Sequence, residues 1–302
     1  MVGKRDIEQY REEGLVLVPG VLDDATRARM HAVLGELVEG SRSVSDHTGV
    51  YDLEPGHSAA EPRVRRIKTP HLVHAVFREF MRSPRLLSVL RALLGDSVRL
   101  HGSKLNLKAP RFGSPVEWHQ DWAFYPHTND DLLAVGVMLD DTTVANGAMY
   151  ALPKTHTGPV YDHHGADGLF CGAIDPDASG LDFTKAVACE GAAGTCSFHH
   201  VRLVHGSAQN TSDRPRSLLL YEAGAADAFP LLGIANYDDF KSRLLCGEET
   251  IVPRMSQVPI RMPMPPAKNQ GSIYENQTAG AKRFFGFTEP SAPTPTRRAA
   301  TT

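Results

Sequence analysis

Glu117-Trp118-His119-Gln120-Asp121-Trp122 carries the strongest chemical pattern in this 302-residue sequence. Side chains alternate between the faces of an extended chain, so the imidazole of His119 and the carboxylate of Asp121 are predicted to point to the same side. A second histidine from a distant strand would complete two nitrogens and one oxygen around a metal ion, with the opposite positions open. This donor set is typical of non-haem Fe(II) oxygenases. Roughly one His-x-Asp triplet is expected by chance at this composition, so the motif needs support from elsewhere in the chain.

That support comes from a second segment, residues 203–221. His205 is predicted to close one strand, a polar turn follows, and Arg216 is predicted to open the next strand. Eleven residues are enough for the chain to turn a corner and run back alongside. The planar guanidinium of an arginine near a metal site is suited to binding a carboxylate in a bidentate manner.

The two segments resemble those of the phytanoyl-CoA dioxygenase-like family of Fe(II)/2-oxoglutarate oxygenases, which includes ectoine hydroxylases and many biosynthetic hydroxylases. The resemblance covers roughly residues 12–225 and is clearest at 104–159 and 194–221. It implies that His119, Asp121 and His205 bind iron. It also implies that Arg216 binds the remote carboxylate of 2-oxoglutarate and that Ser207 assists.

Other residues have weaker claims to the site. Asn106 and Lys68 are predicted to contact 2-oxoglutarate or the substrate, Asn106 because its strand is similar to a cofactor-side strand in ectoine hydroxylases. The aromatic residues that follow the motif are predicted either to line a substrate pocket or to pack in the core: Trp122, Phe124 and Tyr125. Neighbouring residues on a strand point to opposite faces, so the pairs at 163–164 and 199–200 are predicted to take surface or strand-edge positions rather than to bind the metal.

The strand pattern predicts a mainly β fold with flanking helices. Between residues 97 and 225, short strands alternate with Gly, Pro and Asn-Gly turns: 98–107, 118–124, 132–139, 149–152, 186–189, 195–199, 203–204 and 217–221. A double-stranded β-helix, the jelly-roll of cupin-like proteins, would bring an early and a late strand together at one mouth. Helices are predicted at 6–13, 24–38, 72–81 and 84–94, and a strand at 15–19.

One oxygenase domain is predicted over residues 1–288. It consists of a helical N-terminal part (1–96), the jelly-roll core (about 97–225) and a C-terminal covering segment (226–288), in which 237–246 is a short helix and 253–266 is extended. Residues 41–62 are predicted to be irregular and to form a lid. Residues 289–302 are predicted to be a disordered tail.

Composition excludes several classes of protein. A net charge of −3 and the lack of a basic stripe with interleaved aromatic residues argue against nucleic-acid binding. No apolar run approaches 18 residues, which argues against a membrane span, and the N-terminus lacks the apolar stretch of a secretory signal. Four cysteines without C-x-x-C spacing are typical of reduced thiols, so a cytoplasmic location is expected.

The resemblance therefore implies an Fe(II)/2-oxoglutarate-dependent dioxygenase. It would use O2 to hydroxylate or otherwise oxidise a C–H bond of a small metabolite or natural-product intermediate, and would release succinate and CO2. One alternative is an acyl-CoA hydroxylase, favoured by the basic cluster Arg63, Arg65, Arg66 and Lys68. Another is a cupin-type or non-catalytic metal-binding barrel. The sequence leaves the substrate open, and also whether the protein is a monomer or a homodimer.

Overall fold

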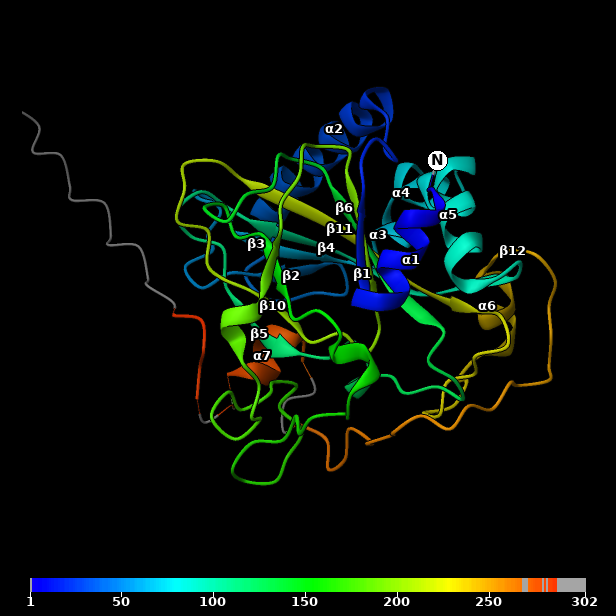
Figure 1. Cartoon of the computed structure of the whole chain (residues 1–302). Coiled ribbons are helices and arrows are strands. Elements are labelled where there is room, and N and C mark those ends of the chain that lie inside the picture. Colours follow the sequence, from blue (N-terminus) through cyan, green and yellow to red (C-terminus); the bar gives the residue numbers. More distant parts are fainter. Residues whose placement is uncertain (1, 268–270, 279, 281, 287–302) are drawn as a thin grey trace, which may run out of the picture.

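Two antiparallel sheets form the centre of the molecule (Figure 1). The computed structural model describes residues 2–267, 271–278, 280 and 282–286. In the larger sheet the strand order is β1-β9-β6-β11-β4-β3-β2, and β12 pairs with β4. Its strands are β1 (Leu15–Val18), β2 (Tyr51–Leu53), β3 (Val64–Lys68), β4 (Val98–Lys108), β6 (Leu132–Met138), β9 (Cys196–His200), β11 (Arg216–Ala225) and β12 (Leu244–Cys246).

The smaller sheet supplies the opposite wall. Its order is β5-β10-β7-β8, from β5 (Val116–His119), β7 (Met149–Ala151), β8 (Val187–Cys189) and β10 (His205–Ser207). Buried apolar side chains from both sheets meet between them, among them Met138, Met149, Ala151, Leu218 and Leu220. This arrangement confirms the predicted jelly-roll core.

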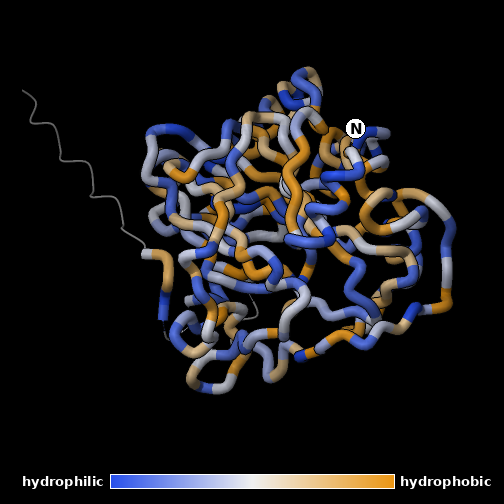
Figure 2. The backbone as a smooth tube through the Cα atoms, viewed as in Figure 1, coloured by the Kyte–Doolittle hydropathy of each residue, from blue (hydrophilic) through white to orange (hydrophobic). Residues whose placement is uncertain are grey.

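Helices cover the outer face of the larger sheet. They are α1 (Lys4–Glu13), α2 (Asp24–Gly40), α3 (Pro70–Val73), α4 (Ala75–Phe80) and α5 (Pro84–Leu94). On β11, Leu219 and Tyr221 face these helices, whereas Leu218 and Leu220 face the smaller sheet, as strand alternation requires. Figure 2 shows the hydrophobic segments concentrated in the interior and the hydrophilic ones on the outer loops. No helix in the described part of the chain is long and apolar enough to cross a bilayer.

Several boundaries differ from the sequence predictions. The helix predicted at 72–81 is split at His74, whose extended backbone and side chain cap α4 by accepting from Val76 N. Gly40 does not end its helix in a left-handed turn but leads into a short 3-10 turn, η1 (Ser41–Ser43). The region 41–62 is not wholly irregular, because β2 pairs with β3 and extends the larger sheet. The helix predicted at 237–246 ends early, as α6 (Tyr237–Ser242), and is followed by β12.

The segments around the motif also differ in detail. The strand predicted at 118–124 ends at His119, and Asp121 begins a 3-10 turn, η2 (Asp121–Ala123), because its carbonyl accepts from Phe124 N. The strand predicted at 203–204 is displaced to β10, which begins at His205. The chain does not return alongside β10 after the turn. Instead β11 joins the other sheet, so His205 and Arg216 reach the interior from opposite walls.

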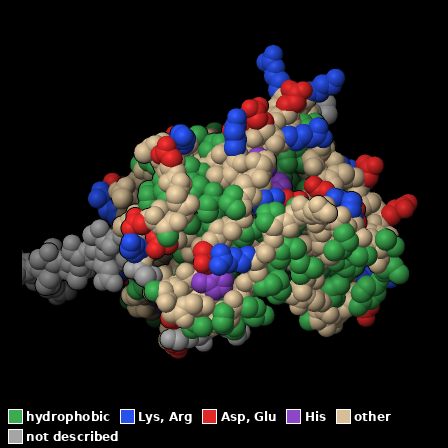
Figure 3. Space-filling model, turned by 60° about the horizontal axis from the view of Figure 1, so that its bottom comes forward, with side chains coloured by type: hydrophobic (Ala, Val, Ile, Leu, Met, Phe, Trp, Pro, Cys, Tyr) green, Lys and Arg blue, Asp and Glu red, His purple; other side chains and the backbone are tan. Residues whose placement is uncertain are grey.

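The C-terminal part wraps around the core. Residues 253–266 are extended, as predicted, and α7 (Ile273–Gln277) lies under β5 (Figure 1). Figure 3 shows hydrophobic side chains gathered on part of the lower face. Exposed large hydrophobic residues of this region include Leu232, Ile251, Val252, Met255 and Met264. The two remaining 3-10 turns are η3 (Thr155–Thr157) and η4 (Phe183–Lys185). The tail predicted at 289–302 lies outside the described residues.

Candidate active site

His119, Asp121 and His205 come together between the two sheets. One ligand atom from each residue lies within 4.8 Å of the others, and all three side chains are buried. His119 ends β5 and pairs directly with His205 at the start of β10, so their ring centroids are 4.1 Å apart. Asp121 Oδ1 is 3.7 Å from His119 Nε2. Two imidazoles and one carboxylate thus form the donor set of a 2-His-1-carboxylate iron site.

The surroundings prepare both imidazoles for a metal ion. His119 Nδ1 is 2.8 Å from the carbonyl of Glu117, and His205 Nδ1 is 2.9 Å from the carbonyl of Leu203. A carbonyl only accepts, so each Nδ1 carries the proton and each Nε2 presents a lone pair. Burial lowers the pKa of His119 to about 4 and that of His205 well below its usual value, which keeps both rings neutral.

The carboxylate is kept ionised. Burial alone raises the pKa of Asp121, but the ammonium of Lys104, 3.9 Å from Oδ1, and the neighbouring imidazoles hold it well below the usual value. Burial also opposes the charge of Lys104, yet the carboxylate of Glu222 at 2.7 Å keeps the pKa of this lysine above its usual value. A charged Lys104 therefore faces the metal-binding side of Asp121.

One end of the cavity carries Arg216, which pairs with Lys108 of the neighbouring strand, and both side chains are buried. Arg216 Nη2 and Nε donate to the carbonyl of Gly147 at 2.8 and 3.2 Å, while Nη1 is buried without a partner. Lys108 Nζ donates to Ser207 Oγ at 2.9 Å and to the carbonyl of Ala208. An unpartnered guanidinium N–H beside a hydroxyl fits the distal carboxylate of 2-oxoglutarate.

Inward-facing residues of β11 and β4 form successive levels along the cavity. Antiparallel pairing sets the levels as Arg216 with Lys108, Leu218 with Asn106, Leu220 with Lys104, and Glu222 with Gly102. Two residues advance about 6.6 Å along a strand, so the first and third levels lie about 13 Å apart. Arg216 and the metal triad therefore lie at different levels of one cavity, which both of them line.

Asn106 and Arg66 occupy the level between these ends. Arg66 Nε donates to Asn106 Oδ1 at 2.8 Å, and both residues line the cavity. Lys68 does not line it, because its ammonium donates to the carbonyl of Thr48. The sequence thus pointed to the right strand, β3. Arg66 and Lys68 share one face of it, but Lys68, at the end of the strand, reaches the carbonyl of Thr48 and only Arg66 lines the cavity.

The basic cluster suggested for an acyl-CoA is already paired. Arg63 contacts Glu61, Arg65 contacts Asp52 at 2.8 Å, and Arg66 contacts Asn106. Asp52 is fully buried, and although burial raises its pKa, the guanidinium of Arg65 more than offsets that effect and leaves the pKa lowered. These contacts give the cluster a structural role at the β2–β3 edge.

The three aromatic residues after the motif separate in the structure. Trp122 is buried with Leu132 and Val201, donates to the carbonyl of Pro259 at 2.9 Å, and is a core residue. Phe124 and Tyr125 line a second, larger cavity of about 420 Å³. Burial and the carboxylate of Asp121 raise the pKa of Tyr125 well above its usual value.

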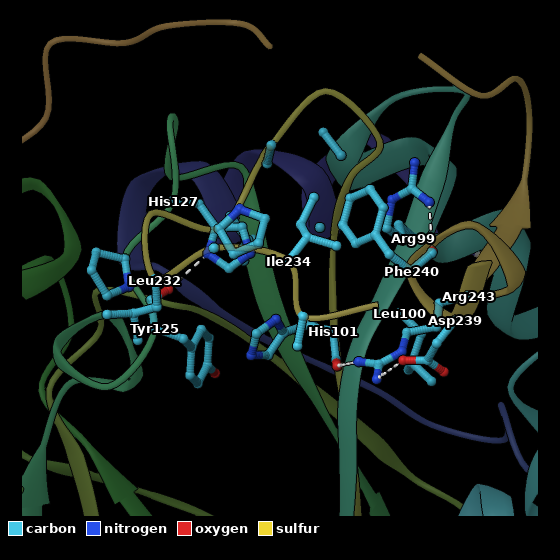
Figure 4. A pocket seen from close by; sticks show the side chains of 18 of the residues that line it. Arg99, Leu100, His101, Tyr125, His127, Leu232, Ile234, Asp239, Phe240 and Arg243 are labelled. Carbon is cyan, nitrogen blue, oxygen red and sulfur yellow. Dashed lines mark hydrogen bonds and ion pairs between the residues drawn. The ribbon is translucent and has the colours of Figure 1, made fainter. Parts of the chain in front are cut away.

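Figure 4 shows the larger cavity from nearby. The ring of His101 stacks on Tyr125 at 4.3 Å, and His127 stands edge-on to His101 at 5.1 Å. Leu232, Ile234 and Phe240, all from the segment after β11, close the other side. His101 and Tyr125 thus form one aromatic side of this cavity.

His199 was not expected at the metal. The next residue on β9, His200, points away from the metal cavity toward Tyr10 and His156, as alternation predicted. His199 instead lines the metal cavity, with its ring 4.6 Å from that of His205 and its Nε2 3.8 Å from Asp121 Oδ2. The signal was present in the sequence, because one of two vicinal histidines on a central strand must face inward.

Helix α7 covers the cavity. Ile273 and Tyr274 line it, and the ring of Tyr274 lies 4.9 and 5.0 Å from the guanidinium carbons of Arg65 and Arg66. Gln277 fixes the helix, since its amide accepts from Glu117 N at 2.9 Å and donates to the carbonyl of Gly172 at 2.8 Å. No local sequence pattern marked this short helix as part of the site.

Comparisons with known proteins agree with this geometry. The model of the family described as Phytanoyl-CoA dioxygenase (PhyH) matches residues 10–218. The chain is 38% identical over 280 residues to a probable alpha-ketoglutarate-dependent hypophosphite dioxygenase of Stutzerimonas stutzeri, which covers 92% of this chain and 98% of that protein. It is 32% identical over 187 residues to L-proline trans-4-hydroxylase of Streptomyces griseoviridis, covering 56% and 68% of the two chains.

A solved structure gives the same result for the fold and the cofactors. The epimerase SnoN, in complex with Fe3+, alpha ketoglutarate and nogalamycin RO, matches 84% of this chain and 96% of its own, with 26% identity and a TM-score of 0.61. The donor set and the cation end described above fit both groups. The chain is therefore an Fe(II)/2-oxoglutarate-dependent dioxygenase that acts on a small molecule, and it belongs to the phytanoyl-CoA dioxygenase family.

Proposed function

We propose that the substrate is a small phosphorus oxyanion, hypophosphite, and that the bond oxidised is P–H. The observation that carries the proposal is the 38% identity to the probable hypophosphite dioxygenase, which extends over 92% of this chain and 98% of that protein. A match over nearly the whole length extends well beyond the iron motif.

The lining of the metal cavity supports an anionic substrate. Arg66, Lys104 and His199 contribute polar or charged groups around the triad. Charged donors in a buried site bind a compact oxyanion more strongly than an apolar metabolite of similar size.

The proposed roles of the site residues follow the geometry. His119, Asp121 and His205 bind Fe(II), and Arg216 with Ser207 binds the distal carboxylate of 2-oxoglutarate. The unpartnered Nη1 of Arg216 and the two Nε2 lone pairs support this assignment. Asn106 and Arg66 lie beside the path of the co-substrate between these ends.

The reaction balances as a single oxygen insertion. When bound, iron and 2-oxoglutarate supply one oxygen atom of O2 for insertion into a strong bond, and the other oxygen atom enters succinate as CO2 leaves. Hypophosphite, H2PO2⁻, then becomes phosphite, H2PO3⁻, as one P–H becomes P–OH. The chain contributes charge to hold the anion, the orientation of the co-substrate, and a site closed by α7.

A second candidate is the hydroxylation of a C–H bond in a small organic metabolite, as the sequence predicted. The cavity of about 420 Å³ beside Tyr125 and His101 favours it, because hypophosphite does not need that volume. The match to L-proline trans-4-hydroxylase over 56% of the chain also supports it.

The test uses purified protein with Fe(II), 2-oxoglutarate and O2, and either hypophosphite, L-proline or no substrate. We expect phosphite, detected by 31P NMR, in a one-to-one ratio with succinate, and none with H119A. Hydroxylated proline without phosphite would instead establish the second candidate. Succinate that forms at the same rate with and without hypophosphite, and no phosphite, would refute the proposal. The cytoplasmic location and the oligomeric state stay predictions.

A further inference from the structure

We propose that His199 binds the substrate directly, with an N–H of its imidazole donating to an oxygen of a small oxyanion beside the metal. The inference rests on the proposed function and adds a specificity-determining residue to it. Lys104 supplies the charge in this arrangement, and His199 supplies the directional hydrogen bond.

The first observation is that His199 lacks partners although it is buried. Its side chain is 1% exposed, yet neither Nδ1 nor Nε2 has a hydrogen-bond partner among the described residues. A buried imidazole without partners is costly to keep, because it loses its bonds to water and gains none. Here the ring faces a cavity, so a bound molecule can restore the missing bond.

The second observation is the position of His199 along the cavity, which strand pairing fixes. Strand pairing places His199 opposite Ala134, and Ala134 opposite Glu222. Glu222 is one level beyond Lys104, on the side away from Arg216 and its carboxylate-binding end. His199 therefore faces the triad from the side opposite the co-substrate's distal end, where a substrate must approach.

The distances favour substrate binding over two other roles. His199 does not belong to the group of ligand atoms that lie within 4.8 Å of one another. Its Nε2 is 3.8 Å from Asp121 Oδ2, a contact longer than a hydrogen bond, so the ring still lacks an acceptor at hydrogen-bond distance.

The chain supplies its own matched control. His200 follows on the same strand, is directed away from the metal cavity, and accepts from Arg202 N through Nδ1 at 3.1 Å. His200→Asn retains a short acceptor for that bond. It changes the same kind of residue on the same strand without touching the site.

The experiment compares wild type with H199F, H199Q and H200N. Fe(II) and 2-oxoglutarate binding are followed by the visible charge-transfer band under anaerobic conditions, and phosphite formation by initial rates. For H199F we expect an unchanged band and a kcat/KM for hypophosphite that is lower by about tenfold to a hundredfold, mainly through KM. H199Q keeps an N–H donor and should recover part of the loss, and H200N should match wild type.

Each contrary outcome has a separate meaning. If H199F oxidises hypophosphite as well as wild type, the role of His199 is refuted while the proposed function stands. If H199F loses the band, His199 acts on the metal and not on the substrate. Formate serves as a second small oxyanion probe. If wild type forms no phosphite, and neither hypophosphite nor formate perturbs its charge-transfer band, the proposed function fails and the inference fails with it.

Discussion

Lys108 is a buried lysine that supports the co-substrate site through its hydrogen bond to Ser207. A Cβ atom at Gly113 would overlap the stem of this lysine, and one at Gly147 would lie 2.7 Å from its Cδ, so glycines on both sides make room for it. Its ammonium donates to Ser207 Oγ. Because that bond uses an oxygen lone pair, the hydroxyl proton of Ser207 is free to point toward a carboxylate bound by Arg216.

We expect Lys108→Met to weaken 2-oxoglutarate binding about tenfold, since Ser207 loses the donor that orients it. Fe(II) binding and the KM for the primary substrate should change little. The dissociation constant of 2-oxoglutarate, from anaerobic titration of the charge-transfer band, provides the measurement. Lys154→Met, at an exposed lysine paired with Glu12, is the control. An unchanged constant in K108M would mean that Ser207 is held by other contacts.

The buried position of Lys108 predicts that the affinity for 2-oxoglutarate depends on pH. Burial, and then repulsion from Arg216, lower the pKa of Lys108 well below its ordinary value of 10.5. A carboxylate bound to Arg216 cancels that repulsion and raises the pKa again, so 2-oxoglutarate binds together with a proton. Affinity should therefore be highest below the pKa that Lys108 has in the empty site and fall as the pH rises through that pKa. K108M should lack this slope in titrations between pH 7 and 9.

Helix α7 shows how a short element can complete a site formed by distant strands. Five residues are too few for a stable isolated helix, so its position depends on tertiary contacts such as those of Gln277. Its Tyr274 lies over Arg65 and Arg66 and lines the metal cavity. The element therefore acts as a cover that excludes water from the co-substrate end.

We expect Tyr274→Ala to uncouple the reaction. Loss of the ring removes two cation–π contacts and admits water, so 2-oxoglutarate should bind about five- to tenfold more weakly. More succinate should form without substrate than in wild type, because the cavity is open. Succinate measured in the absence of substrate tests this directly. Tyr274→Phe keeps the ring and should behave as wild type. If Tyr274→Ala and Tyr274→Phe formed the same amount of succinate without substrate, the ring would not close the site.

Sequence patterns predicted elements with strong local signals and missed those that depend on tertiary contacts. The helix at 84–94 was predicted from Ser83-Pro84 and an apolar stripe, and the structure has the same limits. In contrast, β2 and β12 have three residues each and are stabilised by pairing with β3 and β4. The break at His74 likewise depends on a side-chain cap that helical periodicity does not reveal.

At the scale of the whole molecule, the iron motif was predictable because its chemistry requires particular residue types at fixed spacing. The triad and Arg216 meet between the two sheets, as the jelly-roll prediction required. Lys68, which was selected only by its approximate spacing from the motif, does not line the site. It lies on the same face of β3 as Arg66, but its ammonium donates to the carbonyl of Thr48. Arg66, His199 and Lys108 line or support the site because of the register of their strands.

The charge distribution leads to a final prediction, about stability. The guanidinium of Arg216 is buried at one end of the site with no ion-pair partner among the described residues, so occupation by a dianion should stabilise the entire fold. Burial already lowers the pKa of Arg216 to about 10, which reflects the strain of an unpaired charge. At a 2-oxoglutarate concentration of 100 times Kd, the linkage relation gives about 2.7 kcal/mol of added stability.

That free energy corresponds to a rise in Tm of about 4 °C for a chain of 302 residues. Anaerobic thermal unfolding with Fe(II), before and after addition of 2-oxoglutarate, measures it. Arg216→Gln should remove most of the shift, because the distal carboxylate loses its partner. Arg214→Gln, at an exposed residue of the same turn, should retain the full shift. A shift of equal size in both variants would place the carboxylate elsewhere and would contradict the assignment of the cation end.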